Sequence, residues 1–226
     1  MMNIEICKKA AADKAFTFVK PGMVVGLGTG STAAYFIQAV IDGFHQGVPV
    51  QVVASSKSSF LLAQKGNLPL LNSDELISID LYVDGADEID LQKRMVKGGG
   101  GALLREKILA HMSSQMIAIV DDTKVVKKLG TRPLPVEIVP FGCRATLYHL
   151  ANFGFKGALR LGKDGHPWVT ENQNYLYDLT LSNPVSFDQI HQTICSVPGV
   201  VETGFFPSQA NLVIVGKEDG QTELYS

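Results

Sequence analysis

The sequence has no apolar run approaching the roughly 20 residues that a membrane-spanning helix needs, so we expect no membrane partner. Its three cysteines, Cys7, Cys143 and Cys195, lie far apart and share no C-x-x-C spacing. This argues against a disulfide framework or a zinc site and favours a cytoplasmic protein with reduced thiols. The first residues mix charged and apolar side chains at helical spacing, which predicts an amphipathic helix and not a signal peptide.

An excess of charge of one sign is also lacking. Lys+Arg 20 against Asp+Glu 22 gives a formal net charge of -2, and no long basic run is present, so we do not expect nucleic acid as a partner. The histidines are scattered and show no spacing typical of a metal cluster, which predicts that no metal is bound. They are His45, His111, His149, His166 and His191.

Buried apolar segments alternate with helical patterns in the first half of the chain. The apolar runs predict strands at 23–27, 50–54, 69–71, 81–83 and 116–120. Strands that alternate with helices are typical of an α/β core with a parallel sheet. We expect the apolar segment 211–216 to return to this sheet.

The pattern changes at the proline-rich passage 130–135, which we interpret as a hinge into a second domain. Beyond it, helices are expected at 144–152 and 187–195, and strands at 136–139, 158–161, 168–170, 175–180 and 200–206. Two helices over four antiparallel strands would form a ferredoxin-like α+β module. The sequence therefore predicts a first domain of residues 1–129 and 209–226, with residues 130–208 inserted as the second domain.

A glycine turn, Gly28-Thr29-Gly30-Ser31-Thr32-Ala33, follows the first predicted strand and fits the relaxed dinucleotide pattern G-x-G-x-x-A. The acidic residue that would hold a nucleotide ribose is missing, because the next strand ends in Ser55-Ser56-Lys57. A P-loop lysine is missing as well. We therefore expect no cofactor, and we expect the loop to bind a phosphate or sugar hydroxyls. The alternative is a plain tight turn.

Asp84 and Asp87 lie three positions apart in the turn after strand 81–83. Ligands of open α/β sheets bind beyond the carboxyl ends of the strands, so this turn and the 28–32 loop can face one cavity. A crowded carboxylate pair would raise the pKa of one member towards a value useful for acid–base chemistry. The alternatives are an Asx-type turn with Glu88 in solvent, or a Ca²⁺ or Mg²⁺ site without EF-hand-like spacing.

The stretch from Val96 to Lys107 combines a cation, four consecutive glycines and a carboxylate. Glycines let the backbone approach a ligand closely, and the start of the helix that follows them favours negative charge. Lys97 is then either a charge stabiliser or a surface lysine. Glu106, early in that helix, either takes part in the chemistry or only complements the helix dipole.

The sequence resembles the type A ribose-5-phosphate isomerases over essentially the whole chain. Four motifs carry the resemblance in the family's order: VGLGTGSTAAYF, LYVDGADEID, VKGGGGALLREKIL and PLPVEIVP. The resemblance implies an isomerase that interconverts D-ribose 5-phosphate and D-ribulose 5-phosphate in the pentose phosphate pathway. It also implies a Rossmann-like parallel-sheet core with an inserted ferredoxin-like domain, and assembly as a homodimer or a tetramer.

The resemblance also assigns the site. The sugar phosphate would be bound by Thr29, Gly30, Ser31, Thr32 and Lys124, with Lys8 as a further candidate near the phosphate. Its reacting end would be lined by Asp84, Gly85, Ala86, Asp87, Lys97, Gly98, Gly99 and Gly100. The general base would be Glu106.

The chemistry of the residues agrees with this assignment. An aldose–ketose shift needs a base for the proton beside the carbonyl, a site for the enediolate charge and a group that opens the sugar ring. Glu106, the 97–101 segment and the Asp84/Asp87 pair could supply these without a metal. Two alternatives are a non-catalytic sugar-phosphate-sensing module of related fold and an acyl-CoA transferase with a glutamate nucleophile. The first leaves the carboxylate beside the glycines unexplained, and the second needs an adenosine pocket that the sequence does not identify.

Overall fold

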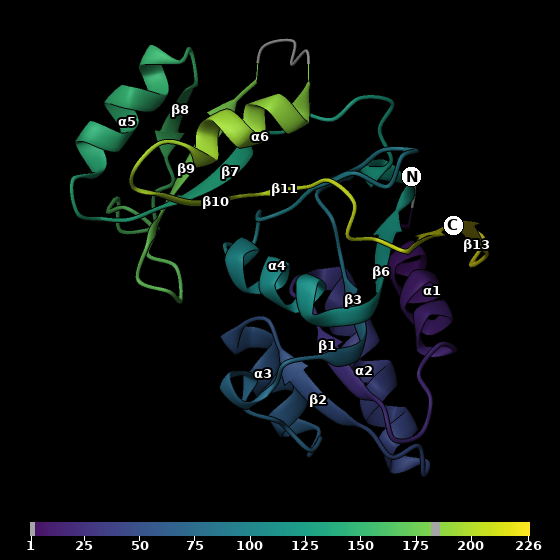
Figure 1. Ribbon diagram of the computed structural model, residues 1–226. Coiled ribbons are helices and arrows are strands. Elements are labelled where there is room, and N and C mark those ends of the chain that lie inside the picture. The colour runs from purple at the N-terminus through teal and green to yellow at the C-terminus, as the bar shows by residue number, and fades with distance from the viewer. Residues whose placement is uncertain (1–2, 182–185) are drawn as a thin grey trace.

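The computed structural model describes residues 3–181 and 186–226, and its centre is a six-stranded sheet (Figure 1). The strand order is β13-β12-β6-β3-β1-β2. All neighbours in it are parallel except β12 and β13, which are antiparallel. The strands are β1 (Val24–Leu27), β2 (Gln51–Ala54), β3 (Ile79–Asp84), β6 (Ser113–Asp121), β12 (Leu212–Gly216) and β13 (Thr222–Tyr225). The predicted parallel α/β core is confirmed, and so is the return of the 211–216 segment.

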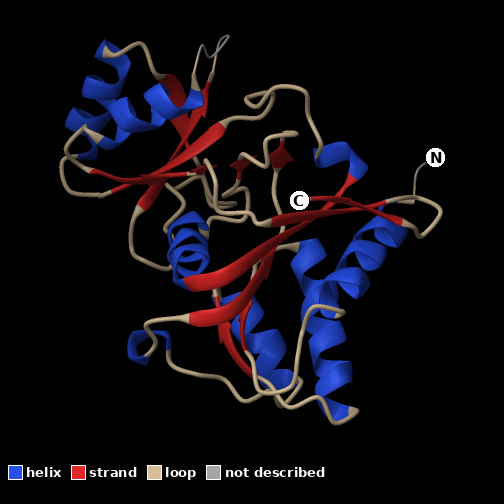
Figure 2. Ribbon diagram, turned by 45° about the vertical axis from the view of Figure 1, so that its right-hand side comes forward, coloured by secondary structure: helices blue, strands red, loops and turns tan. Residues whose placement is uncertain are grey.

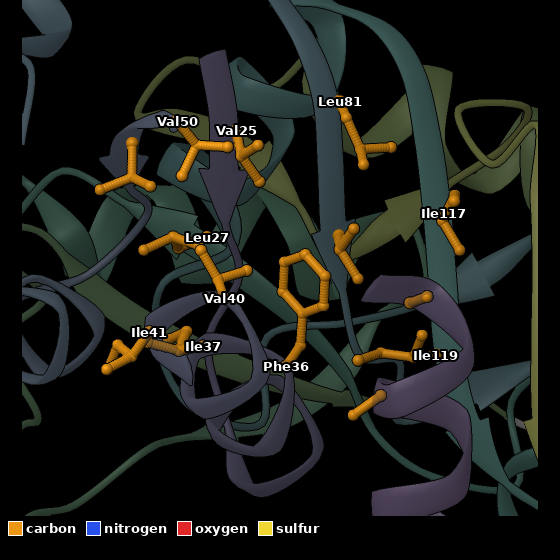
Figure 3. Packing of buried hydrophobic residues seen from close by; sticks show 14 of the residues in the cluster. Val25, Leu27, Phe36, Ile37, Val40, Ile41, Val50, Leu81, Ile117 and Ile119 are labelled. Atoms are coloured by element: carbon orange, nitrogen blue, oxygen red, sulfur yellow. The ribbon is translucent and has the colours of Figure 1, made fainter. Parts of the chain in front are cut away.

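Helices cover both faces of this sheet (Figure 2). Successive side chains of a strand point to opposite faces. Leu81 and Ile117 therefore pack with Phe36 beneath α1 (Ile4–Phe16) and α2 (Ser31–His45), as Figure 3 shows. Tyr82 and Met116 point the other way and pack against Leu109 of α4 (Leu103–Met112).

Shorter helices complete the first part of the chain. They are α3 (Lys57–Lys65) and the 3₁₀ turns η1 (Ser73–Glu75) and η2 (Asp122–Lys124). Ala63 of α3 is buried in the same cluster as Phe36. None of the helices described is both long and apolar enough to cross a membrane.

A second, four-stranded antiparallel sheet has the order β10-β7-β9-β8. Its strands are β7 (Leu134–Ile138), β8 (Lys156–Leu159), β9 (Tyr175–Thr180) and β10 (Val200–Thr203). Leu150 of α5 (Cys143–Asn152) and Ile194 of α6 (Phe187–Cys195) are buried with Val136 and Leu179 of the sheet. The predicted ferredoxin-like module is therefore confirmed. The domain limits at 129/130 and 208/209 stay a prediction, and residues 182–185 of the predicted second domain lie outside the described residues.

The single strand predicted at 200–206 is wrong. It divides at Gly204 into β10 and β11 (Phe205–Phe206), and β11 joins a small third sheet with β5 (Met95–Val96) and β4 (Glu88–Ile89). The Gly204 amide donates to Pro135 O, and Gly204 O accepts from the Lys97 amide at 2.8 Å. A Cβ at Gly204 would lie 2.1 Å from Lys97 O, so this crossing needs glycine. The second module thus leads directly to the strand that precedes Lys97.

Two other predicted strands are also wrong. The segments 69–71 and 168–170 contribute only the isolated bridges Val52↔Leu70 and Val169↔Tyr175. Pro69 has no amide hydrogen for a ladder, and Thr170 instead donates its hydroxyl to Glu137 at 2.9 Å.

Glu88 is not in solvent, contrary to one of the sequence-based alternatives. It is 1% exposed. Its carboxylate accepts hydrogen bonds from the Gly130 amide at 2.7 Å, the Arg132 amide at 2.6 Å and the Thr131 hydroxyl. The passage interpreted as a hinge is therefore tied to the buried end of the 84–88 turn.

Candidate active site

A cavity of about 120 Å³ lies where the loops after β1, β3 and β6 meet the glycine run that precedes α4. This is the carboxyl end of the parallel sheet, where α/β proteins bind ligands. Every residue that the sequence assigned to the site lines it, except Asp84 and the further candidate Lys8. The lining consists of Thr29, Gly30, Ser31, Thr32, Gly85, Ala86, Asp87, Lys97, Gly98, Gly99, Gly100, Glu106 and Lys124.

Asp84 is fully buried and is not among the residues that line the cavity. Its Oδ1 accepts hydrogen bonds from the amides of Thr29 at 2.9 Å and Gly85 at 2.7 Å. Its Oδ2 accepts from the Tyr82 hydroxyl at 2.5 Å and lies 2.9 Å from Lys97 Nζ. A Cβ at Gly28 would lie 2.2 Å from Asp84 Oδ1, which explains the glycine there. Asp84 therefore joins the loops that form the cavity.

Asp87, in contrast, lines the cavity, and its Oδ2 accepts a hydrogen bond from the Gly99 amide at 2.7 Å. The sequence suggested that the two aspartates face the ligand as a pair. In the structure only Asp87 lines the cavity. Asp87 is open to a ligand, while Asp84 has a supporting position.

Lys97 is a buried cation, only 3% exposed, and not a surface lysine. Its Nζ lies 2.9 Å from Asp84 Oδ2 and 3.2 Å from Glu106 Oε2, and it donates to Gly85 O at 2.5 Å. Burial alone would lower the pKa of Lys97, but the carboxylates of Asp84 and Glu106 outweigh this effect and raise it. Lys97 therefore carries a fixed positive charge at the cavity wall.

Glu106 lies in the first turn of α4, 3% exposed, with its carboxylate at the cavity. Burial raises its pKa to about 8, because the favourable charge of Lys97 is opposed by desolvation and by the negative charge of Asp84. Although Oε2 lies 3.2 Å from Lys97 Nζ, the described residues offer it no aligned hydrogen-bond donor. Glu106 thus combines a raised pKa with a place at the cavity wall beside Lys97.

The other end of the cavity suits a phosphate. α2 begins at Ser31, and the first amides of a helix have no acceptor within it. The hydroxyl-bearing Ser31 and Thr32 line the cavity together with Lys124 of η2. Lys8 pairs with Glu5 at 2.7 Å and is not among the lining residues.

Two residues of the second module that the sequence did not single out, Arg160 and Trp168, lie against the glycine run. Arg160 donates from Nη1 to Gly98 O at 2.9 Å and to Gly99 O at 3.0 Å. A Cβ at Gly101 would lie 3.0 Å from Trp168 Nε1. No motif signals these contacts, because Arg160 and Gly98 are 62 positions apart.

One histidine, His191, does have metal-ligand neighbours in space, although the sequence predicted none. His191 Nδ1, Cys195 Sγ and a Glu202 carboxylate oxygen lie within 4.8 Å of one another. However, Lys107 Nζ already lies 2.9 Å from Glu202 Oε1. Burial and the Glu202 charge raise the pKa of the Cys195 thiol to about 11, which keeps it protonated. This group is therefore a poor cation site.

Comparison with known sequences identifies relatives of the whole chain. The sequence matches the family described as ribose 5-phosphate isomerase A (phosphoriboisomerase A) over residues 51–220. The ribose-5-phosphate isomerase A of Protochlamydia amoebophila is 44% identical over 220 residues, which cover 96% of this chain and 94% of the relative. That of Bacillus mycoides is 40% identical over 224 residues, covering 99% of this chain and 100% of the relative.

Solved structures agree. A D-ribose-5-phosphate isomerase in complex with phospho-erythronic acid has a TM-score of 0.94 at 35% identity, with 99% of both chains covered. The ribose 5-phosphate isomerase A of Methanocaldococcus jannaschii has a TM-score of 0.90 at 35% identity, with 96% of both chains covered. The chain belongs to the ribose-5-phosphate isomerase A family.

Proposed function

We propose that Glu106 is the base with which this aldose–ketose isomerase interconverts D-ribose 5-phosphate and D-ribulose 5-phosphate through an enediolate. The observation that carries the proposal is the Glu106 carboxylate itself. It is buried at the cavity wall beside Lys97, and burial raises its pKa to about 8. A general base works best when its pKa lies near the working pH.

When the aldose is the substrate, Glu106 removes the proton from C2 of the open-chain sugar. The electron pair of the C2–H bond forms the C1–C2 double bond, and the C1 carbonyl oxygen takes up the negative charge. The proton of the O2 hydroxyl then passes to O1, the carbonyl forms at C2, and Glu106 returns its proton to C1. Atoms and charge balance, and no electrons leave the sugar.

The negative charge of the enediolate is stabilised by Lys97 and by backbone amides of the glycine run. Lys97 is suitable because its own salt bridge with Asp84 holds the ammonium in place before the substrate arrives. Fixed donors of this kind avoid the cost of reorganising solvent during the reaction. Removing one such donor in an enzyme typically lowers kcat by about 10²–10³-fold.

Asp87 opens the sugar ring, because it is the aspartate of the pair that lines the cavity. Its carboxylate can accept the C1 hydroxyl proton of the cyclic form and return that proton to the ring oxygen as the bond between C1 and the ring oxygen breaks. Asp84 acts through Lys97 and is a positioning residue. This division of roles follows from their burial, since Asp84 is 0% exposed.

The phosphate is bound at the start of α2 by backbone amides, by Ser31 and Thr32 and by the ammonium of Lys124. One solved relative is in complex with phospho-erythronic acid. As its name says, this compound carries a phosphate and a carboxylic acid group. In the orientation proposed for the substrate, its phosphate would lie at α2 and its carboxylate near Lys97.

For the assembly we propose a cytoplasmic homodimer, with a tetramer as the alternative. The support is the resemblance to the family and the three free cysteines, Cys7, Cys143 and Cys195. Light scattering coupled to size-exclusion chromatography measures the mass of the assembly. The named relatives give no support to the non-catalytic sensor.

The variant Glu106→Gln tests the proposal, since it keeps the shape of the side chain and removes its basicity. We expect kcat to fall by at least about 10²-fold while the KM for ribose 5-phosphate changes little. A coupled assay measures both, and circular dichroism checks that the variant is folded. Activity within a few-fold of the unchanged protein would disprove the role of Glu106.

A further inference from the structure

One hydrogen bond within the glycine run, from the Gly101 amide to Gly98 O at 3.0 Å, closes a turn. Because glycines are conformationally free, contacts from outside the run add to this single bond in keeping one shape. Gly98 has φ +103° and Gly101 has φ +82°, values that ordinary residues rarely adopt. Its first end is held by the hydrogen bond from the Lys97 amide to Gly204, and its far end by α4. The carbonyls between these two ends are bound by Arg160.

Arg160 is itself rigidly held. It follows β8, and its amide donates to Leu176 O at 2.8 Å. Its Nε and Nη2 donate to the two carboxylate oxygens of Asp178 at 2.9 and 2.5 Å, a bidentate pair. This leaves Nη1 to donate to the carbonyls of Gly98 and Gly99 at 2.9 and 3.0 Å. The guanidinium is therefore fixed before any ligand binds.

The direction of these two carbonyls sets the direction of the amides that follow them. In a trans peptide the C=O and the next N–H point in opposite directions. With Gly98 O turned to Arg160, the Gly99 amide must point to the other side, and it does so, donating to Asp87 Oδ2 at the cavity. With Gly99 O also turned to Arg160, the Gly100 amide must likewise point away from Arg160, and Gly100 lines the cavity.

We propose that Arg160 is a positioning residue for the isomerisation. By drawing the Gly98 and Gly99 carbonyls away from the substrate, it directs the Gly99 amide to Asp87 and the Gly100 amide towards the reacting end. It also keeps two carbonyl dipoles from facing the negative charge of the enediolate. The second module thereby supplies part of the active site of the first. This inference rests on the function proposed above, since it assumes that the glycine amides stabilise that charge.

The variant Arg160→Met tests it, because methionine keeps much of the apolar stem and removes every donor. We expect kcat to fall about ten- to hundredfold, as displaced donors lose their alignment, while the KM for ribose 5-phosphate changes less than about threefold because the phosphate end is untouched. The inhibition constant of phospho-erythronic acid should rise in parallel with the loss of kcat, because its carboxylate uses the same amides. Arg160→Lys should recover only part of the activity, since one ammonium cannot reproduce the bidentate and bifurcated pattern.

A matched control is Glu171→Gln. Glu171 also contacts the first part of the chain from the second module, through Arg105 and the Lys57 amide, but it does not touch the glycines. For Glu171→Gln we expect kcat and the inhibition constant of phospho-erythronic acid to stay within about twofold of the values of the unchanged protein, because the Arg105–Glu171 ion pair is exposed. If Arg160→Met does not fold, Asp178→Asn tests the positioning role instead. This smaller change weakens the bidentate pair that fixes the Arg160 guanidinium, and it should lower kcat several-fold.

A folded Arg160→Met with unchanged kcat and unchanged inhibition would overturn the positioning role. So would an equal loss in Glu171→Gln, which would indicate general loosening between the two modules. Failure of this inference is distinguishable from failure of the proposed function. In the first case the unchanged protein turns over ribose 5-phosphate and Glu106→Gln does not, while in the second case Glu106→Gln remains active.

Discussion

Two buried glutamates lie in the two modules, and by burial alone they look alike. Glu106 of α4 is 3% exposed and Glu137 of β7 is fully buried. Each has an Oε2 atom for which the described part of the chain supplies no hydrogen-bond partner. Yet one is the proposed base of the reaction, and nothing in the structure gives the other a part in the chemistry.

The difference is in what surrounds the two carboxylates. Glu137 Oε1 accepts three hydrogen bonds from neutral donors, the hydroxyl of Thr170 and the side-chain amides of Asn172 and Asn174, at 2.9 to 3.1 Å. Glu106 instead faces a cavity and lies beside the cation of Lys97. Three donors from one loop fix a carboxylate in a single geometry, whereas a carboxylate at a cavity wall beside a cation can exchange a proton with a ligand. Burial and an unpartnered oxygen are therefore not sufficient evidence of catalysis.

The largest effect is expected from Lys97→Met, which removes the cation that distinguishes the two glutamates. kcat should fall by about 10²–10³-fold, because the enediolate loses its charge partner. The free energy of unfolding should fall by about 3–5 kcal/mol, because the buried charge of Asp84 loses its cationic partner. A coupled assay and urea unfolding measure the two quantities.

The double variant Lys97→Met with Asp84→Asn separates these two effects. Removing both charges should recover much of the stability but none of the activity, because the uncompensated buried charge is gone and the catalytic cation is still missing. Recovery of activity would contradict the role assigned to Lys97.

The next effect concerns pH. Since burial raises the pKa of Glu106 to about 8, the free enzyme is a better base as the pH rises. We expect kcat/KM to increase with an ascending limb near that value, separate from the titration of the substrate phosphate near pH 6. Measurement from pH 5 to 9 checks this. A flat profile above pH 6 would show that Glu106 ionises at its ordinary pKa.

The raised pKa also has a consequence for stability. An acid whose pKa is higher in the folded than in the unfolded state binds more protons in the folded state. Its contribution to the free energy of unfolding is fully present below the unfolded-state pKa and is lost as the pH rises through the folded-state pKa. Glu106→Gln should therefore gain stability relative to the unchanged protein between about pH 5 and 8, by at least about 1 kcal/mol. Urea unfolding at both pH values measures the difference.

The smallest effect on activity is expected from Glu137→Gln, the same chemical change at the other glutamate. The amide can keep the three donors on its oxygen, but its NH₂ group then occupies a buried position without an acceptor among the described residues. We expect the free energy of unfolding to fall by about 1–3 kcal/mol and kcat to stay within about threefold. A loss of kcat like that of Glu106→Gln, without loss of stability, would remove the distinction between the two residues.

Much of the site could be predicted from the sequence because it consists of short segments with local signals. Glycine turns after apolar strands identify the 28–32 and 84–88 loops, and parallel strands bring their carboxyl ends to one edge. Glu106 follows the glycine run closely enough to share its site. These positions depend on contacts between neighbouring strands, which the order of the elements already implies.

What could not be predicted depends on contacts between distant segments. The sequence places Asp84 and Asp87 in one turn, but only the packing of Lys97 and Thr29 shows which of them is buried. Arg160 lies in a stretch without a motif, and its contacts with Gly98 and Gly99 are set by the packing of the second module. Glu137 lies within PLPVEIVP, but its donors Thr170, Asn172 and Asn174 come from a distant loop of the same module. The division of the predicted 200–206 strand likewise depends on the crossing of Gly204 with Lys97.

The proton transfer by Glu106 is tested most directly by turnover in D₂O. A carboxylate base can exchange its captured proton with solvent before returning it, so the account predicts deuterium on the sugar carbon that receives the proton. It also predicts that activity survives exhaustive treatment with a chelator and that Glu106→Gln incorporates no deuterium on the same timescale. Product without solvent deuterium, from an enzyme that loses activity on chelation and regains it with Mg²⁺ or Mn²⁺, would contradict the account in favour of a metal-assisted hydride shift.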